Sequence, residues 1–290
     1  MAEGSQRVVI IGGGVGGLSA ALALRDRGHH VTLLERNAEF GGKLAVRRRD
    51  GFTFDIGPSL ITLPHVLDAR VRERLQLRRL DPQFRYFWRD GDSLTVGDAG
   101  TDRAGYREFV AGGERIWDIS ERTFFAGPMD NPMALLRRMR SPRDLTGIDP
   151  LRTLAAVAKR SFTDAHMQQW AGRYATYSGS SPFRAPATLS CIPAIESRYG
   201  CWYPIGGLGA LRDALVDATT IAGAELRSSA EVARVVSVGG RVSGVELADG
   251  SRIAADVVIA NVDAEHLYRD LLANGRALRR VQRAARSTSG

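Results

Sequence analysis

Short apolar runs separated by glycine-rich turns dominate the start of the chain. Residues 8–11 form a continuous β-branched run, which is typical of a strand buried in a parallel sheet. Strong helix formers with apolar residues at helical spacing follow over residues 18–25, and Gly28 is placed to cap that helix. Residues 31–34 form a second apolar run. The pattern therefore predicts a βαβ unit.

The later part of the chain has a different pattern, in which strand-sized runs follow one another without a helix. Residues 232–238 and 242–247 are predicted strands joined by a two-glycine turn. An Asp-Gly turn at residues 249–250 precedes a further strand at residues 256–260. This spacing predicts a β-meander that leads into another strand.

The middle of the chain carries weaker signals. Residues 86–92 predict a strand and a turn, and residues 94–96 the return strand. Residues 132–160 are basic with interleaved apolar residues, but Pro142 and Pro150 break the run. One long interfacial helix is therefore excluded. The solvated face of a helical cap is favoured, and contact with anionic lipid stays open as the alternative.

Three glycines after the first strand have the spacing of a dinucleotide-binding fingerprint. Gly12 permits a tight turn, Gly14 lets the backbone approach a pyrophosphate, and Gly17 lets helix and strand pack closely. The N-terminus of the helix that follows this loop offers free N–H groups and the positive end of the helix dipole, which favour phosphate. The loop is therefore predicted to hold a dinucleotide.

An acidic residue completes the fingerprint. Glu35 follows the second strand, close to the expected spacing of about 20 residues. Its carboxylate is suited to accept hydrogen bonds from both ribose hydroxyls and to repel a 2′-phosphate, although Arg36 beside it weakens the second argument. The pair Gly41 and Gly42 indicates a second close approach of backbone to the same cofactor.

Two stretches of the chain favour one family. Residues 51–58 read GFTFDIGP, where aromatic and polar residues alternate as in a strand before a Gly-Pro turn suited to lie beside a ring system. Together with the fingerprint, this stretch resembles the start of the carotenoid (phytoene-type) desaturase family of the FAD-dependent amine oxidase superfamily. Residues 173–211, which contain TYSGSSPF and GGLGAL, resemble the central region of that family and favour the carotenoid branch over the amine oxidases.

The resemblance implies which residues contact FAD. The first glycines would bind the pyrophosphate, Glu35 the adenosine ribose, and the later glycine pair would lie along the flavin side. Lys43 stands where the family usually has arginine, and lysine keeps the charge but loses the bidentate fork. Val232 matches the position whose backbone meets the adenine, and Asn261 matches the end of the strand that rejoins the sheet. The implied cofactor-binding set is Gly12, Gly14, Val15, Gly16, Gly17, Glu35, Arg36, Gly41, Gly42, Lys43, Leu44, Gly57, Pro58, Ser59, Val232 and Asn261.

The resemblance also implies an α/β fold with two domains. Residues 1–70 and 206–264 would form a Rossmann-like FAD-binding domain, with a parallel sheet plus a β-meander. Residues 71–205 and 265–290 would form an inserted α+β substrate domain. Family members continue past the point that matches residue 290, so the chain is expected to be truncated at its C-terminus.

The activity that the resemblance implies is desaturation of a carotenoid or carotenoid precursor, an apolar polyene, by hydride transfer to FAD. No catalytic residue is singled out by spacing. Asp55 would lie near the flavin by the resemblance, but a structural hydrogen-bonding role is preferred for it.

Composition and charge narrow the alternatives. The 290 residues carry a net charge of +8 from scattered basic residues, which predicts a mildly basic surface without an aromatic-basic motif for nucleic acid. The two cysteines lack CxxC spacing and the five histidines lack ligand spacing, so no metal site is expected. No run is long and apolar enough to be expected to span a membrane. A cytoplasmic location is expected, with peripheral contact at the cytoplasmic membrane face left open, as is the oligomeric state.

Two other functions stay open at this point. Another FAD oxidase on the same scaffold, of the amine or porphyrinogen type, is disfavoured by the FDIGP and TYSGSSPF stretches. GDP-dissociation inhibitors share the scaffold without redox chemistry, so a non-catalytic, truncated flavin-binding relic is the second alternative. Retention of flavin would argue for a working cofactor site.

Overall fold

The structure is a computed structural model that describes residues 4–96, 103–127 and 132–289. The chain divides into two compact units. The sheet unit comprises Met1–Leu60, Pro64–Arg78 and Tyr203–Gly290, and the helical unit comprises Ile61–Leu63 and Arg79–Trp202. The outer ends of the predicted domains, at residues 1–3 and 290, lie outside the described residues.

The predicted grouping differs from these units at two boundaries, where residues 61–63 fall in the helical unit and residues 71–78 and 203–205 in the sheet unit, and at the end of the chain. Residues 265–290 were assigned to the substrate domain, whereas they fall in the sheet unit. The physical reason is packing, because Leu271 is buried in the core formed by the parallel sheet and the meander, with Leu267 against it.

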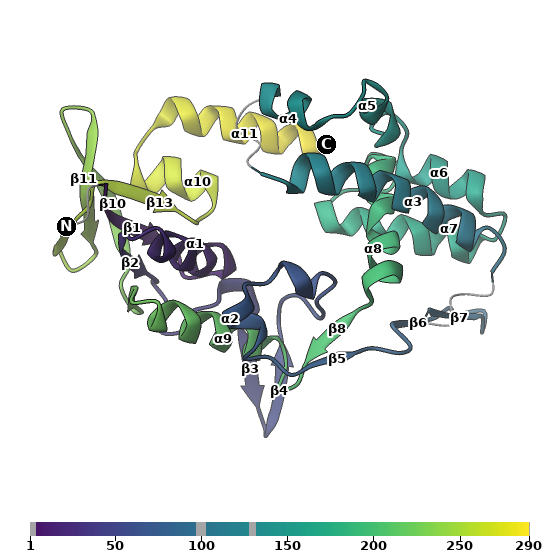
Figure 1. Ribbon diagram of the computed structural model, residues 1–290, viewed down its shortest axis with the longest axis horizontal. Coiled ribbons are helices and arrows are strands. Elements are labelled where there is room, and N and C mark those ends of the chain that lie inside the picture. Colours follow the sequence, from purple (N-terminus) through teal and green to yellow (C-terminus); the bar gives the residue numbers. More distant parts are fainter. Residues whose placement is uncertain (1–3, 97–102, 128–131, 290) are drawn as a thin grey trace. The chain divides into compact units, whose positions relative to one another are not determined.

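A four-stranded parallel sheet forms the centre of the sheet unit, in the order β13-β1-β2-β9 (Figure 1). β1 (Arg7–Ile11) lies between β2 (His30–Leu34) and β13 (Val257–Ala260), and β9 (Glu225–Arg227) lies at the edge beside β2. The β-branched residues of β1 are buried, which is why this apolar run forms a central strand.

An antiparallel meander packs on this sheet. It comprises β10 (Val232–Val238), β11 (Arg241–Leu247) and β12 (Arg252–Ala254). Val232 and Val245 are buried in one core with residues of β1 and β2. The parallel sheet and the meander predicted from the sequence are both confirmed.

Helices and short elements complete the sheet unit. α1 (Val15–Asp26) packs against α9 (Leu208–Ile221), where Thr219 donates a hydrogen bond to the carbonyl of Leu18 at 3.3 Å. The predicted cap is present, since Gly28 has a φ of 81° and donates to the carbonyl of Arg25. The other elements are η1 (Gly42–Leu44), β3 (Val46–Arg49), β4 (Phe52–Asp55), η2 (Pro64–Val66), α2 (Ala69–Arg72), α10 (Ala264–His266), η6 (Leu267–Leu271) and α11 (Gly275–Ser289). β5 (Leu77–Arg79) and β8 (Trp202–Pro204) carry the chain from one unit to the other.

The helical unit has an aromatic core. Phe109, Phe162, Trp170 and Tyr174 are buried, with ring centroids 5.3–6.1 Å apart in the contacting pairs. Its elements are β6 (Phe84–Phe87), β7 (Ser93–Val96), α3 (Tyr106–Ser120), η3 (Glu121–Phe125), α4 (Pro132–Arg138), α5 (Arg143–Gly147), α6 (Leu154–Ser161), α7 (Ala165–Gly172), η4 (Arg173–Ser178), η5 (Ala187–Ser190) and α8 (Cys191–Tyr199).

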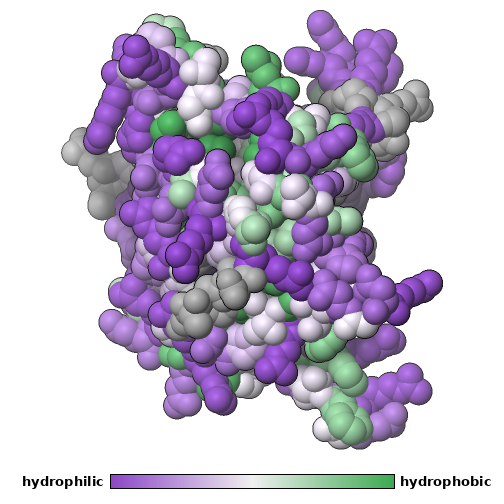
Figure 2. Space-filling view, turned by 90° about the vertical axis from the view of Figure 1, so that its right-hand side faces the viewer, coloured by the Kyte–Doolittle hydropathy of each residue, from purple (hydrophilic) through white to green (hydrophobic). Residues whose placement is uncertain are grey.

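Three short helices cover the basic segment of the helical unit, as the two prolines predicted. On the face shown in Figure 2, hydrophobic residues occur in small groups among hydrophilic ones. Over the described ranges, no helix is both long enough and apolar enough to cross a bilayer.

Candidate cofactor site

A cleft of about 870 Å³ opens in the sheet unit where β1, β2 and β13 end. Ligand pockets are typically about 300–1,000 Å³, so the volume suits a small-molecule cofactor. Eleven of the predicted cofactor-binding residues line it, and they are Gly12, Gly14, Val15, Gly16, Glu35, Arg36, Gly41, Gly42, Lys43, Val232 and Asn261. Segments far apart in the sequence thus meet at one edge of the parallel sheet.

The glycines of the first loop have separate roles. Gly12 has a φ of 100°, and a Cβ there would stand 2.5 Å from the carbonyl oxygen of Asn261. A Cβ on Gly17 would collide with the carbonyl oxygen of Gly12, so this glycine allows helix and turn to approach. A Cβ on Gly14 would meet only the Asn261 amide nitrogen, at 3.5 Å, and would otherwise face the cleft. Gly14 therefore leaves open space on the ligand side.

The N-terminus of α1 offers hydrogen-bond donors to the cleft. Gly14 is the N-cap and has no side chain, and the first intrahelical bond runs from the Leu18 N–H to the Gly14 carbonyl at 3.0 Å. The N–H groups of Val15, Gly16 and Gly17 accordingly precede the first helical hydrogen bond. No acidic residue occupies the first turn of α1, so no side chain of the helix itself offsets the positive end of its dipole.

Glu35 is buried at the end of β2, with both carboxylate oxygens held. Oε2 accepts the Gly13 N–H at 2.8 Å. Oε1 accepts the backbone N–H of Asn37 at 2.9 Å and its side-chain amide at 2.6 Å. The carboxylate therefore braces the glycine turn, and its remaining lone pairs are available to a ligand hydroxyl.

The second glycine pair approaches the first loop directly. The Gly41 N–H donates to the Gly13 carbonyl at 2.7 Å, and Gly41 and Gly42 have φ of 112° and 56°. Behind Gly41 lies Arg212, which is buried and bonded to Glu39 and Asp213. A Cβ on Gly41 would meet Arg212 at 2.7 Å, and a Cβ on Gly42 would stand 3.3 Å from the Cα of Gly14.

One arginine and one lysine at the cleft make no ion pair with another described residue. Among the described residues, neither Arg36 nor Lys43 has an ion-pair partner, and both line the cleft. These two cations are able to bind an anionic group such as a pyrophosphate, while the carboxylates of Glu231, Asp263 and Glu265 line another part of the same cleft.

The remaining predicted residues lie off the cleft lining. Gly17 and Leu44 are buried beneath it, while Gly57, Pro58 and Ser59 are not among the lining residues. A Cβ on Gly57 would collide with the carbonyl oxygen of Lys43, so close backbone packing accounts for that glycine. Any contact of these residues with a flavin ring stays a prediction.

Both carboxylate oxygens of Asp55 accept hydrogen bonds within the fold, which is the structural role preferred from the sequence. Its Oδ1 accepts the Leu208 N–H at 2.9 Å, and its Oδ2 accepts the Tyr203 hydroxyl at 2.8 Å. The carboxylate thereby caps the first turn of α9, whose own N-cap Gly207 has no side chain. The hydrogen bond to Asp55 raises the pKa of Tyr203.

Several lining residues were missed from the sequence. Asn37, Ala230 and Glu231 are close to predicted residues in the sequence, so they could have been inferred from those neighbours. Val262 and Asp263 follow Asn261 in the same way, whereas Glu265, His266 and Arg269 lie on α10 and η6 without any motif.

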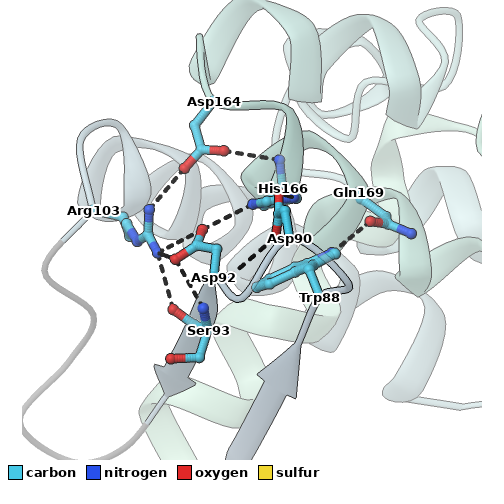
Figure 3. Close-up of polar contacts among 8 residues, drawn as sticks. All are labelled: Trp88, Asp90, Asp92, Ser93, Arg103, Asp164, His166 and Gln169. Carbon is cyan, nitrogen blue, oxygen red and sulfur yellow. Dashed lines mark hydrogen bonds and ion pairs between the residues drawn. The ribbon is translucent and has the colours of Figure 1, made fainter.

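The helical unit holds a second cluster of titratable groups, around His166 (Figure 3). Its Nδ1 lies 2.8 Å from Asp92 and its Nε2 lies 3.1 Å from Asp90, while the ring stacks on Trp88 with centroids 4.3 Å apart. Because a neutral imidazole carries one N–H, both contacts are hydrogen bonds only when the ring is protonated. His166, and then Arg103, lower the pKa of Asp92 to about 2. The cluster fastens the β6–β7 turn to α7.

Glu196 is the buried acid of the helical unit. Its side chain accepts hydrogen bonds from the hydroxyls of Tyr174, at 2.5 Å, and Tyr177, at 3.2 Å. Burial raises the pKa of Glu196, and these hydrogen bonds and Arg173 oppose the rise. The acid is therefore satisfied internally, and we assign it no catalytic role. Over the described residues, no three His, Cys, Asp or Glu side chains are grouped to hold a metal ion.

The fold and the cleft define an α/β protein of the dinucleotide-binding type, in which Gly14 leaves open space at the cleft and Arg36 and Lys43 line it. The model of the family described as flavin containing amine oxidoreductase matches residues 15–290, and the chain belongs to that family. Its cofactor is accordingly FAD, and the donors at the α1 N-terminus and the open face of Gly14 fit that group.

Two curated relatives are oxygenases by name. The chain is 33% identical to a 4,4'-diapolycopene oxygenase of Methylomonas sp over an alignment 306 residues long. The alignment covers 99% of this chain and 62% of that protein. It is 28% identical to a 4,4'-diaponeurosporene oxygenase of Staphylococcus haemolyticus, covering 92% of this chain and 57% of that protein. The chain thus spans about three fifths of the length of these relatives.

The fold is also found in a solved structure. An oxidoreductase from Methanosarcina mazei superposes with a TM-score of 0.63 at 19% identity, covering 92% of this chain and 61% of that chain. The shared architecture supports the α/β fold class expected from the sequence.

Proposed function

We propose that this flavin-dependent oxidoreductase desaturates a carotenoid or carotenoid precursor. The observation that carries the proposal is the cleft at the end of the parallel sheet, where Gly14 leaves open space beside the Arg36 and Lys43 side chains. The carotenoid-pathway names of the relatives support an apolar polyene as the substrate.

Each part of the cleft would hold a different part of FAD. The N–H groups at the start of α1 and the Lys43 ammonium would bind the pyrophosphate, and Glu35 would accept hydrogen bonds from the ribose. The backbone of Val232 would meet the adenine. Bound FAD supplies the hydride acceptor for the oxidation. The chain's residues bind and orient the group, and Asn37 keeps the Glu35 carboxylate in place.

Oxygenation of the polyene is a second candidate, because both named relatives are called oxygenases. The products distinguish the two reactions. Desaturation removes two hydrogen atoms from the polyene, whereas oxygenation adds oxygen, so mass spectrometry separates them.

Peripheral contact with a membrane belongs to the same proposal, because an apolar polyene partitions into lipid. In the helical unit, Met133 and Leu136 on α4 are exposed beside Arg137. An apolar pair with a flanking cation is suited to the boundary between lipid tails and headgroups.

The first test is flavin retention by the 290-residue chain. The protein is incubated with excess FAD and desalted, and its absorption spectrum is recorded. A retained flavin spectrum supports the cofactor assignment, and incubation with phytoene in liposomes then tests the reaction. Folded protein that carries no flavin would contradict the site, and bound flavin with an unchanged polyene would contradict the reaction while leaving the site intact.

A further inference from the structure

Four arginines form a single stripe along α11. Arg276, Arg279, Arg280 and Arg283 are spaced i, i+3, i+4 and i+7, which places them on one face of a helix. All four are exposed. The stripe extends for about 10 Å along the axis at about 1.5 Å per residue. It is a compact, strongly positive surface.

α11 packs against α10 and η6 of the sheet unit (Figure 1). Asn274 caps the start, accepting the Ala277 N–H at 3.1 Å. Leu278 and Val281 are half-buried, and Gln282 donates to Glu265 on α10 at 3.1 Å. Because the apolar face packs inward, the arginine face is held outward.

The charge of the stripe is not compensated. Within the described part of the chain, none of the four guanidinium groups has an ion-pair or hydrogen-bond partner. Arg269, on the neighbouring element η6, shows the contrast, because it is paired with both Glu265 and Asp270. Four like charges at this spacing repel one another, and an anionic surface would relieve that repulsion.

We propose that the α11 stripe docks the protein on an anionic lipid bilayer. The choice of lipid rests on the proposed function, because an apolar polyene is delivered from a membrane. The stripe itself favours lipid over nucleic acid, since no aromatic side chain lies among residues 275–283 to stack on bases. Each arginine near an anionic surface strengthens binding about fivefold, so the stripe contributes several hundredfold.

Vesicle sedimentation with the whole chain tests the proposal. We expect the protein to bind vesicles of phosphatidylcholine with phosphatidylserine, and to bind phosphatidylcholine vesicles far more weakly. Raising the salt concentration should weaken the binding, because exposed charges are screened. The double variant R279Q/R280Q keeps helix-forming residues and removes two stripe charges, so its affinity should fall about 30-fold.

The matched control removes two exposed charges elsewhere. Arg85 and Arg241 lie on β-hairpins and are exposed, so R85Q/R241Q changes the net charge equally without touching α11. Circular dichroism verifies that both variants fold. An equal loss of binding in the two variants would overturn the proposal, because net charge alone would then be responsible. Absence of vesicle binding by the natural sequence, or tighter binding to an oligonucleotide than to vesicles, would overturn it too. Flavin retention is measured on the same samples, so failure of docking is separable from failure of the cofactor site.

Discussion

Replacing Gly14 by alanine should weaken FAD binding while leaving the fold intact. The added methyl group would stand 3.5 Å from the Asn261 amide nitrogen, which is an ordinary van der Waals distance. The backbone at Gly14 is extended, with a φ of −73°, so alanine adopts it without strain. As Gly14 is the N-cap of α1, losing glycine there costs about 1 kcal/mol of stability or less.

The cost falls instead on the ligand side, where the methyl group fills space that a pyrophosphate needs. Displacing a phosphate from one charged hydrogen bond costs about 1.5–3 kcal/mol, so the Kd for FAD should rise about ten- to hundredfold. Titration of FAD against the protein, followed by flavin fluorescence, measures this change. Thermal unfolding without FAD verifies the fold.

Gly17→Ala is the matched control for this experiment. Its Cβ would collide with the Gly12 carbonyl oxygen, so overpacking should lower the free energy of unfolding by about 1–3 kcal/mol. The two variants therefore distinguish loss of space for the ligand from a clash within the fold. If Gly14→Ala bound FAD with the natural Kd, the pyrophosphate would not lie against this loop and the reasoning would fail.

Three further changes have definite expected outcomes. Asn37→Ala removes a side-chain hydrogen bond from Glu35, so the Kd for FAD should rise up to about tenfold in the same titration, and an unchanged Kd would show that the brace is unimportant. His166 is the main reason why the pKa of Asp92 is about 2, below its unfolded value of about 3.9. Asp92 therefore contributes to the free energy of unfolding above about pH 4, and this contribution is lost as the pH falls towards 2. Asp92→Asn should flatten that decline in urea unfolding measured across this range. Burial raises the pKa of Glu196, so the folded state binds the proton of this acid more tightly than the unfolded state does. The free energy of unfolding therefore falls as the pH rises through the folded pKa. Glu196→Gln should remove this dependence in the same unfolding assay.

The sequence predicted the elements whose signals are local. β1, β2, β10, β11 and β13 each have an apolar run bounded by turn residues, and the structure has them within a residue or so of the predicted bounds. β9 was not predicted, because Glu225–Arg227 has only three residues and is held by its parallel pairing with β2. Such a strand has no periodicity to detect.

The candidate site was predicted where backbone geometry requires glycine. Gly12 and Gly17 could be assigned because only glycine fits their turns, and Gly14 because bulk there would fill the cleft. His266 on α10 and Arg269 on η6 carry no such constraint, and they line the cleft where η6 packs against β10 of the meander. Contacts that depend on tertiary packing cannot be detected in a local sequence pattern.

The sheet order has a consequence for how the chain is made. β1 is flanked by β2 and by β13, and the hydrogen bond from the Arg7 N–H to Asp256 joins residues 249 positions apart. A ribosome therefore releases β1 and β2 long before β13 exists, and until then the apolar run at the start of the protein has an open edge. Long-range parallel pairing is slow, so nascent chains are exposed to aggregation during that interval. The cleft for the cofactor is completed only after β13 and η6 have been made, so the N-terminal strand stays unpaired at that edge before the chain can hold flavin.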